Sequence, residues 1–349
     1  MRTRIKRNQP LSIVFLLISL VCISISTSSG QPNQPGDILK KKQQEFLNWK
    51  FGIFLHFNMA TFYNEEWANG YEDARLFKPS RLDCSQWADA AKAAGMNYGV
   101  LTVKHTGGWC LWDSKYTTHD ITGFVNFRNG KGDLVKEFVD AFRSRGLKVG
   151  LYYCLPGNYS NQFGNNLENG KPDLHGLFPE ATGDFEWYIE KQVEELLTRY
   201  GKIDLLWFDQ YSNPYTAKYW QQLKLLVHKL QPDCVVIANN SSSFNETDII
   251  GYEYPYLKSA KPGHEIPLAG NREPSEVCDC IDERGWFWHP GGEKVSRVED
   301  IVKMVRLCNS RSANYLLDVP PDTSGILPPI YVSQLKAVGE ALKQNANPK

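Results

Sequence analysis

The chain has 349 residues, of which 42% are hydrophobic and 22% are charged. This composition excludes a disordered chain, and the length suits a single α/β barrel, which commonly takes about 250 residues. The 39 basic and 39 acidic side chains cancel, and no basic block follows the first few residues. Binding to nucleic acid through its phosphates is therefore not expected.

The first thirty residues have the pattern of a secretory signal. Four basic residues lie within positions 1–7, an apolar run covers 11–25, and small polar residues follow to position 30. The run is shorter than the ~20 residues that span a membrane as a helix, although an uncleaved anchor is the alternative. We expect a signal peptide at 1–30, a secreted extracellular protein (apoplastic in a plant) and no membrane association after cleavage.

Helical and strand patterns alternate along the rest of the chain. Apolar runs without alternation predict strands buried on both faces, and amphipathic segments that end at a glycine or proline predict helices. Long loops follow the strands, and no G-x-G-x-x-G or Walker motif is present. The pattern favours an α/β fold, a TIM-like (β/α) barrel with functional loops at the C-terminal ends of the strands. The predicted strands are 51–57, 98–103, 147–153, 203–209, 234–238 and 314–319, and the helices are 83–95, 133–145, 184–200, 217–230 and 331–344.

Cysteines and glycosylation sequons are compatible with secretion. After removal of Cys22 seven cysteines remain, so at least one is free or pairs between chains, and several are expected to fill the core. N-x-S/T sequons make surface loops at Asn158, Asn239, Asn240 and Asn245 candidates for glycosylation. The sequons at 239 and 240 overlap, so we do not expect both to be occupied.

Polar side chains end several of the predicted strands. His56, His105 and Asp209 each follow an apolar run, and the short run 248–254 presents Glu253. Each alone could be a core histidine or a helix cap, but the barrel brings all of them to one mouth. No H-E-x-x-H or G-x-S-x-G motif supports zinc or serine chemistry, which leaves a carboxylate pair among aromatic residues. This pattern favours glycoside cleavage, which needs no metal or organic cofactor.

Four segments resemble a known family: 51–58 (FGIFLHFN), 103–117 (VKHTGGWCLWDSKYT), 205–210 (LLWFDQ) and 314–325 (NYLLDVPPDTSG). The chain resembles the retaining α-L-fucosidases of glycoside hydrolase family 29, most closely the secreted plant type. The resemblance covers about 50–328. It implies that Asp209 is the nucleophile and that Glu253 is the acid/base, with Glu276 as the alternative. The sugar-contacting residues implied by the resemblance are His56, Glu66, Trp67, His105, Tyr153, Trp207 and Trp286.

Two features depart from the family pattern. Thr106 follows His105 where the family usually has a second histidine, and no strand-rich tail corresponding to the usual C-terminal β-sandwich follows residue 319. The predicted domains are therefore the signal peptide (1–30) and one catalytic barrel (31–349).

The resemblance implies a retaining exo-α-L-fucosidase. It would release terminal α1,3- or α1,4-linked L-fucose from oligosaccharides or N-glycans. The alternatives are a catalytically impaired fucose-binding protein of the same fold and another retaining, galactosidase-like glycosidase.

Overall fold

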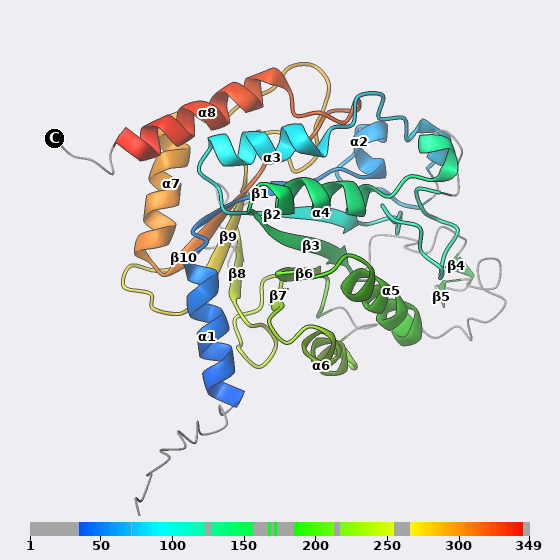
Figure 1. Ribbon diagram of the computed structural model, residues 1–349, viewed down its shortest axis with the longest axis horizontal. Coiled ribbons are helices and arrows are strands. Elements are labelled where there is room, and N and C mark those ends of the chain that lie inside the picture. The colour runs from blue at the N-terminus through cyan, green and yellow to red at the C-terminus, as the bar shows by residue number, and fades with distance from the viewer. Residues whose placement is uncertain are drawn as a thin grey trace, which may run out of the picture.

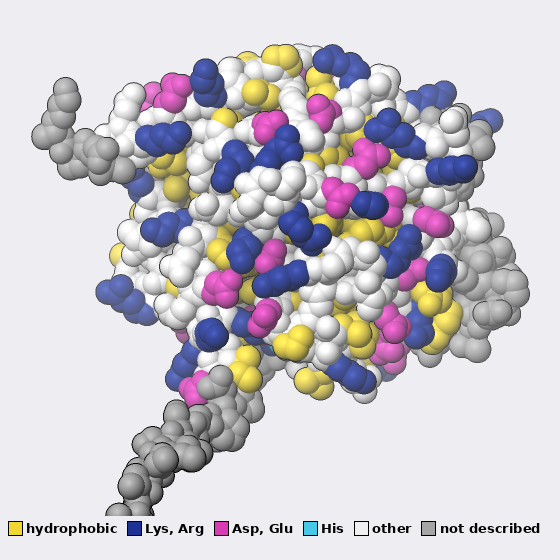
Figure 2. Space-filling model, viewed as in Figure 1, with side chains coloured by type: hydrophobic (Ala, Val, Ile, Leu, Met, Phe, Trp, Pro, Cys, Tyr) yellow, Lys and Arg dark blue, Asp and Glu magenta, His cyan; other side chains and the backbone are white. Residues whose placement is uncertain are grey.

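The computed structural model (Figure 1) describes residues 35–70, 72–122, 127–155, 167–168, 171–172, 185–212, 217–254 and 266–344. The predicted signal peptide and Asn158 lie outside these residues. None of the helices in the described ranges is long and apolar enough to cross a membrane. On the face shown in Figure 2, basic and acidic side chains are interspersed, and neither sign forms a continuous patch.

Eight parallel strands form one nearly closed barrel, which confirms the predicted TIM-like (β/α) fold. Neighbours in the sheet follow the order β7-β6-β3-β2-β1-β10-β9-β8. All residues of β1, β2, β7 and β10 are buried, which explains why these strands show no alternation of apolar and polar residues. The strands are β1 (Phe51–Leu55), β2 (Tyr98–Lys104), β3 (Lys148–Cys154), β6 (Leu205–Asp209), β7 (Val235–Ala238), β8 (Ile250–Glu253), β9 (Ser275–Cys280) and β10 (Ala313–Asp318).

Helices surround the sheet (Figure 1). They are α3 (Cys84–Ala93), α4 (Leu134–Ser144), α5 (Phe185–Arg199), α6 (Trp220–Leu230), α7 (Val298–Ser310) and α8 (Pro329–Gln344). Shorter elements are α2 (Met59–Tyr63), η1 (Ala74–Leu76), η2 (Arg128–Gly130) and the antiparallel pair β4 (Leu167–Glu168) and β5 (Lys171–Pro172). Helix α1 (Pro35–Leu47) packs near the starts of β7 and β10, where Lys42 donates to the Cys234 carbonyl and the Asn314 amide donates to the Phe46 carbonyl.

Helix capping follows the sequence signals. The Asp83 carboxylate accepts hydrogen bonds from two backbone N–H groups at the start of α3, and Asp133 accepts one at the start of α4. Gly95 and Gly146 then adopt positive φ angles directly after these helices, a conformation that glycine tolerates without steric cost. These local signals explain why helices α3 and α4 were predictable to within one or two residues.

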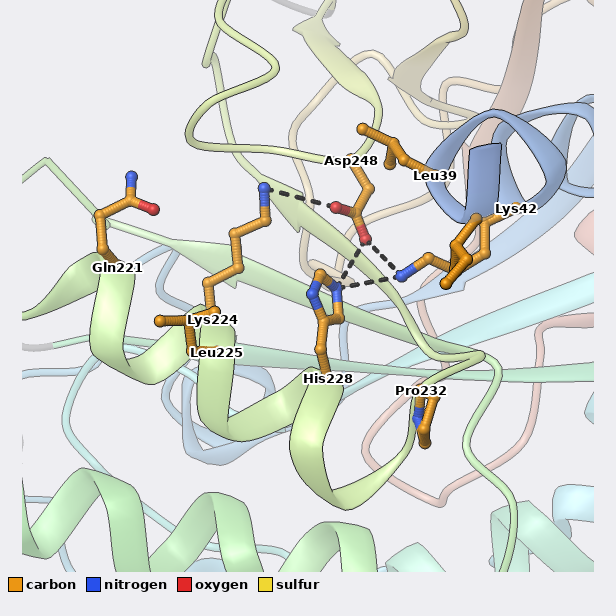
Figure 3. A pocket seen from close by; sticks show the side chains of 9 residues that line it. Leu39, Lys42, Gln221, Lys224, Leu225, His228, Pro232 and Asp248 are labelled. Carbon is orange, nitrogen blue, oxygen red and sulfur yellow. Dashed lines mark hydrogen bonds and ion pairs between the residues drawn. The ribbon is translucent and has the colours of Figure 1, made fainter. Parts of the chain in front are cut away.

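The barrel has a seam between β7 and β8, which share no ladder of hydrogen bonds. One backbone hydrogen bond, from the Asp248 N–H to the Val236 carbonyl at 2.8 Å, crosses the seam, and side chains add further links. Asp248, just before β8, accepts a hydrogen bond from the Val236 N–H at 3.0 Å. Lys42 from α1 and Lys224 and His228 from α6 converge on its carboxylate (Figure 3), at 3.2, 3.4 and 2.9 Å. These charges close the seam at the strands' N-terminal ends.

Candidate active site

The Asp209 carboxylate, at the C-terminal end of β6, accepts three hydrogen bonds. The Tyr152 hydroxyl donates to Oδ2 at 2.9 Å, and the Gln210 N–H and the Asn239 amide donate to Oδ1 at 2.8 and 3.1 Å. Gln210 takes a left-handed conformation, with φ of 60°, immediately after the strand. Such backbone conformations cluster at functional sites. The side chain is therefore fixed in orientation while it remains half-buried at the barrel mouth.

Glu253 lies across the seam from Asp209, at the end of β8. Its Oε2 accepts hydrogen bonds from the amides of Asn239 and Asn240, at 3.0 and 3.1 Å. Asn239 Nδ2 therefore donates to both carboxylates. Because the shared nitrogen lies at 3.1 and 3.0 Å from the two oxygens, these oxygens are at most about 6 Å apart. The carboxyl groups of retaining glycosidases lie about 5–5.5 Å apart.

His56 lies among three carboxylates and is held by a fourth. Its Nδ1 contacts Asp318 Oδ1 at 2.7 Å, which leaves Nε2 for a ligand. Burial lowers the pKa of His56 to about 4, although the charges of Glu66, Asp209 and Glu253 act in the opposite direction. Burial also raises the pKa of Asp318, so both shifts favour an uncharged pair. The imidazole is thus suited to hydrogen bonding a neutral hydroxyl.

His105 reaches the site beside His56. Its ring stacks on Tyr152, with centroids 5.5 Å apart, and its edge meets the ring of His56 at the same separation. Burial lowers the pKa of His105 well below its ordinary value. Thr106 turns its hydroxyl to His105 Nδ1 at 3.2 Å. Thr106 therefore holds this imidazole at its Nδ1 atom.

Aromatic rings line the interior next to the carboxylates. Trp207 stacks on Tyr152 at 5.3 Å, and Phe54 contacts both rings. Trp286 covers His56 with a centroid distance of 5.1 Å and also meets Phe54. Flat apolar faces of this kind suit the hydrophobic side of a sugar ring.

The prediction that Tyr153 contacts the sugar is wrong, because its neighbour Tyr152 is the tyrosine that faces Asp209. Tyr152 pairs with Trp207 and faces the interior, so the alternation of the strand turns Tyr153 to the outer face. There the Tyr153 hydroxyl donates to Gln192 of α5 at 2.6 Å and accepts from Lys104 at 3.0 Å. Tyr153 therefore fastens α5 to the sheet.

Glu66 and Trp67 follow α2 at the rim of the barrel. The Glu66 carboxylate accepts the backbone N–H groups of Trp286 and Phe287, at 2.9 and 3.2 Å, and contacts His289 at 2.7 Å. Glu66 thus anchors the loop that carries Trp286. Trp67 has half of its surface exposed, and a sugar contact by either residue stays a prediction.

The alternative acid/base, Glu276, lies inside the barrel and not at its mouth. It is the second residue of β9, is 1% exposed, and pairs in register with Gly251 near the start of β8. Tyr98 and Trp207 donate to its two oxygens at 2.6 and 2.9 Å. Burial raises the pKa of Glu276 to about 7, while these two hydrogen bonds act in the opposite direction. The geometry therefore favours Glu253 as the acid/base and gives Glu276 the position of a support beneath Trp207.

The prediction of glycosylation at Asn239 is wrong for the folded protein. Asn239 is 8% exposed, and the amide nitrogen that would carry the glycan donates to Asp209 and Glu253. Asn240 is exposed, but its amide also contacts Glu253. Asn245 is exposed, and its modification stays a prediction.

The sequence pattern places Tyr152 at the end of a strand but does not distinguish it from Tyr153. It does not assign Asn239 or Asp318 to the site, although both share a detectable signal with Asp209, a polar side chain at the end of an apolar run. The sequon at Asn239 drew attention to a surface role instead. Within the described ranges, no group of three or more His, Cys, Asp or Glu side chains could hold a metal ion.

Comparison with known proteins identifies the family of the chain. A sequence model of the family described as alpha-L-fucosidase matches residues 21–347. The chain is 30% identical to alpha-L-fucosidase 1 of Arabidopsis thaliana, over 90% of this chain and 62% of that protein. It is also 30% identical to a putative alpha-L-fucosidase 1 of Oryza sativa subsp. japonica, over 86% of this chain and 59% of that protein. The chain thus spans about three fifths of the length of these relatives.

Solved structures give the same family. Alpha-L-fucosidase isoenzyme 1 from Paenibacillus thiaminolyticus superposes with a TM-score of 0.69 at 26% identity, covering 88% of this chain and 77% of that one. A putative alpha-L-fucosidase from Bacteroides thetaiotaomicron has the same TM-score and identity, covering 86% and 67%. With the family match extending over most of its length, the chain belongs to the alpha-L-fucosidase family.

Proposed function

We propose that the protein is a retaining exo-α-L-fucosidase that acts on terminal α-linked L-fucose by double displacement. The observation that carries this proposal is the pair Asp209 and Glu253, two half-buried carboxylates that share one hydrogen-bond donor at the barrel mouth. Their close approach suits a mechanism with a covalent intermediate, because an inverting enzyme needs a wider gap for water. Membership of the alpha-L-fucosidase family supports L-fucose as the sugar that is released.

In the first step, an Asp209 oxygen attacks the anomeric carbon as the bond from that carbon to the leaving oxygen breaks. Glu253 gives its proton to the leaving oxygen, which departs as an alcohol. In the second step, Glu253 takes a proton from water, and the water oxygen displaces Asp209 from the anomeric carbon. Glu253 is protonated again, Asp209 is released as a carboxylate, and fucose keeps its configuration.

The surrounding residues suit the binding of a deoxysugar. The uncharged imidazoles of His56 and His105 can exchange hydrogen bonds with hydroxyl groups. Trp207 and Trp286 offer apolar surface to the parts of the ring that lack hydroxyls. We propose α1,3- or α1,4-linked fucose on oligosaccharides or N-glycans as the substrate, on the basis of similarity to the plant members.

The decisive experiment is hydrolysis of an aryl α-L-fucoside by the full chain and by Asp209→Ala. We expect turnover by the wild type and a loss of at least about a thousandfold in the variant. Azide should restore release of the phenol by the variant and yield the β-fucosyl azide, because a small anion can enter the gap left by the carboxylate. An Asp233→Ala control, at an exposed position outside the site, should keep full activity. Appreciable hydrolysis by Asp209→Ala without azide would refute the assignment.

One observation favours a second candidate, a fucose-binding protein with impaired catalysis. Thr106 occupies the position of a second histidine and binds His105, so a hydroxyl contact to the sugar is altered. Calorimetry with L-fucose separates the two candidates. Binding without any hydrolysis of the aryl fucoside would support the impaired protein. Turnover that disappears in Asp209→Ala would exclude it.

Secretion belongs to the same proposal. The basic residues and apolar run within 1–30 support export with cleavage near residue 30. Expression of the full chain in a eukaryotic secretory host, followed by N-terminal sequencing of protein from the medium, tests it. An uncleaved N-terminus retained in the membrane fraction would contradict the proposal.

A further inference from the structure

We propose that Asn239 is a positioning residue that sets the distance between the nucleophile and the acid/base across the β7/β8 seam. This inference rests on the proposed function. Neither carboxylate can set the distance by itself, because Asp209 belongs to β6 on one side of the seam and Glu253 to β8 on the other.

The backbone ties Asn239 to the side of the nucleophile. Its N–H donates to the Phe208 carbonyl at 2.8 Å, which extends the pairing of β7 with β6 by one residue. Asn239 therefore lies next to Asp209 whatever the position of β8. In contrast, Glu253 lies on β8, whose one ladder among the described strands is with β9.

The side chain of Asn239 then spans the gap. A primary amide has two N–H bonds on one nitrogen, and here that nitrogen donates to Asp209 Oδ1 at 3.1 Å and to Glu253 Oε2 at 3.0 Å. The reverse orientation would turn the amide oxygen toward two carboxylate oxygens, so the carboxylates themselves decide which way the amide points. The amide oxygen is buried and has no hydrogen-bond partner among the described residues. The two carboxylates thus provide the side-chain hydrogen bonds that hold this amide.

Asn240 supplies a matched comparison. Its amide donates to the same Glu253 oxygen at 3.1 Å, but the side chain is exposed and makes no contact with Asp209 in the described structure. Its φ of 59° allows glycine without backbone strain. Asn240→Gly therefore removes one link to Glu253 and keeps the bridge, whereas Asn239→Ala removes the bridge.

The first test compares these variants on an aryl α-L-fucoside across the pH range. We expect Asn239→Ala to lose about a hundredfold in kcat with little change in KM, because a misplacement of about 1 Å between reacting groups has this effect. The limbs of its pH profile should shift, since both carboxylates lose a donor. Asn240→Gly should lose only a few-fold. Equal kcat and pH profiles for Asn239→Ala and the wild type would overturn the proposal.

Asn239→Asp provides a second variant of the same shape, in case Asn239→Ala does not fold. An ionised carboxylate cannot donate and repels its two neighbours, whereas a protonated one donates a hydrogen bond. We therefore expect very low activity at neutral pH and partial recovery as the pH falls. A purely structural role for Asn239 predicts no such recovery, and a flat pH dependence would count against the bridge.

A binding measurement separates failure of this proposal from failure of the proposed function. An L-fucose-configured iminosugar carries a ring ammonium that can pair with the two carboxylates, and calorimetry follows its binding without turnover. Much weaker binding to Asn239→Ala than to Asn240→Gly would support the bridge even if the wild type hydrolysed no fucoside. Unchanged binding and unchanged kcat in an active enzyme would reject the bridge and leave the proposed function intact.

Discussion

A shift in strand register decides which side chains reach the site. Thr102 pairs with Tyr152, but Lys104 pairs with Tyr153, so β2 has one extra residue at this point. This β-bulge turns Lys104 to the outer face and allows the next residue, His105, to face the interior. Strict alternation would have placed His105 outside the barrel. Sequence periodicity predicts the strand, but it does not show the bulge.

Removal of the hydroxyl group should have opposite effects at Tyr152 and Tyr153, on activity at the first and on stability at the second. Tyr152→Phe removes a hydrogen bond to Asp209, the proposed nucleophile, so we expect kcat to fall about ten- to a hundredfold with normal stability. Tyr153→Phe removes the links to Gln192 and Lys104, so we expect a loss of about 1–3 kcal/mol in the free energy of unfolding with normal kcat. Aryl fucoside kinetics and urea unfolding check both. A greater loss of activity in Tyr153→Phe would contradict this orientation of β3.

Glu276 predicts a pH-dependent stability. The pKa of Glu276 is raised in the folded protein to about 7. The protonated Glu276 therefore contributes fully to the free energy of unfolding at pH values below the ordinary pKa of glutamate, and this contribution is lost as the pH rises through 7. The loss amounts to about 3 kcal/mol. In Glu276→Gln the amide can accept from Trp207 and donate to Tyr98, so the unfolding free energy between pH 5 and 8 should vary less than in the wild type.

The same variant tests the choice of acid/base. We expect Glu276→Gln to keep kcat within a few-fold, because it retains both hydrogen bonds, whereas Glu253→Gln should lose most activity toward an unactivated fucoside. Activity loss confined to Glu276→Gln would reverse the assignment.

At the scale of elements, the predictable parts are those with a local signal. The capped helices α3 and α4 and the apolar strands β1, β2, β3, β6 and β7 appear close to the predicted bounds. Strand β9 was missed because Glu276 and Asp279 interrupt its apolar pattern, and both find partners only in the folded barrel, Tyr98 and Tyr315 among them. Helices α1 and α7 were also missed, although the spacing of Ile301, Val305 and Cys308 gives α7 a helical face.

The loop after β9 depends on one glycine. Gly285 has a φ of 152°, and an added Cβ there would overlap the Glu66 carboxylate. We expect Gly285→Ala to displace Glu66, release the Trp286 backbone and raise KM about tenfold. Gly292→Ala is the control, because its φ is 97° and the space around it is open. An equal rise in KM in the two variants would show that backbone strain, and not the overlap, is responsible, and a wild-type KM in Gly285→Ala would contradict the prediction.

At the scale of the whole molecule, the charges around Asp248 compensate for the missing ladder. Burial alone would raise the pKa of Asp248, but the hydrogen bond from His228 and the charges of His228, Lys42 and Lys224 hold it well below its ordinary value. The ionised Asp248 therefore contributes to stability at pH values above the ordinary pKa of aspartate, and this contribution is lost as the pH falls through the lowered pKa of Asp248 in the folded protein. No local sequence pattern predicts this cluster, because its members come from α1, α6 and the segment before β8.

Asp248→Asn should therefore destabilise the protein by about 3–5 kcal/mol at neutral pH, because two buried lysines lose their counter-charge. Chemical unfolding measures the change, and the difference from the wild type should shrink in acid. Asp300→Asn, which breaks the exposed pair with Arg297, serves as the control and should unfold like the wild type. Equal effects of the two variants would show that the seam does not depend on Asp248.

The seven cysteines of the described chain are all buried, and none forms a disulfide. Burial raises the pKa of Cys84, Cys278 and Cys280 well above the ordinary value, so these thiols are inert while the barrel stays closed. The cysteines can therefore report how often the protein unfolds globally. A pulse of maleimide should modify several thiols of one molecule together only when that molecule opens globally, and the mass spectrum would give the fraction of such molecules. Stepwise modification of single sulfurs would instead reveal local opening, and would show which part of the barrel opens first.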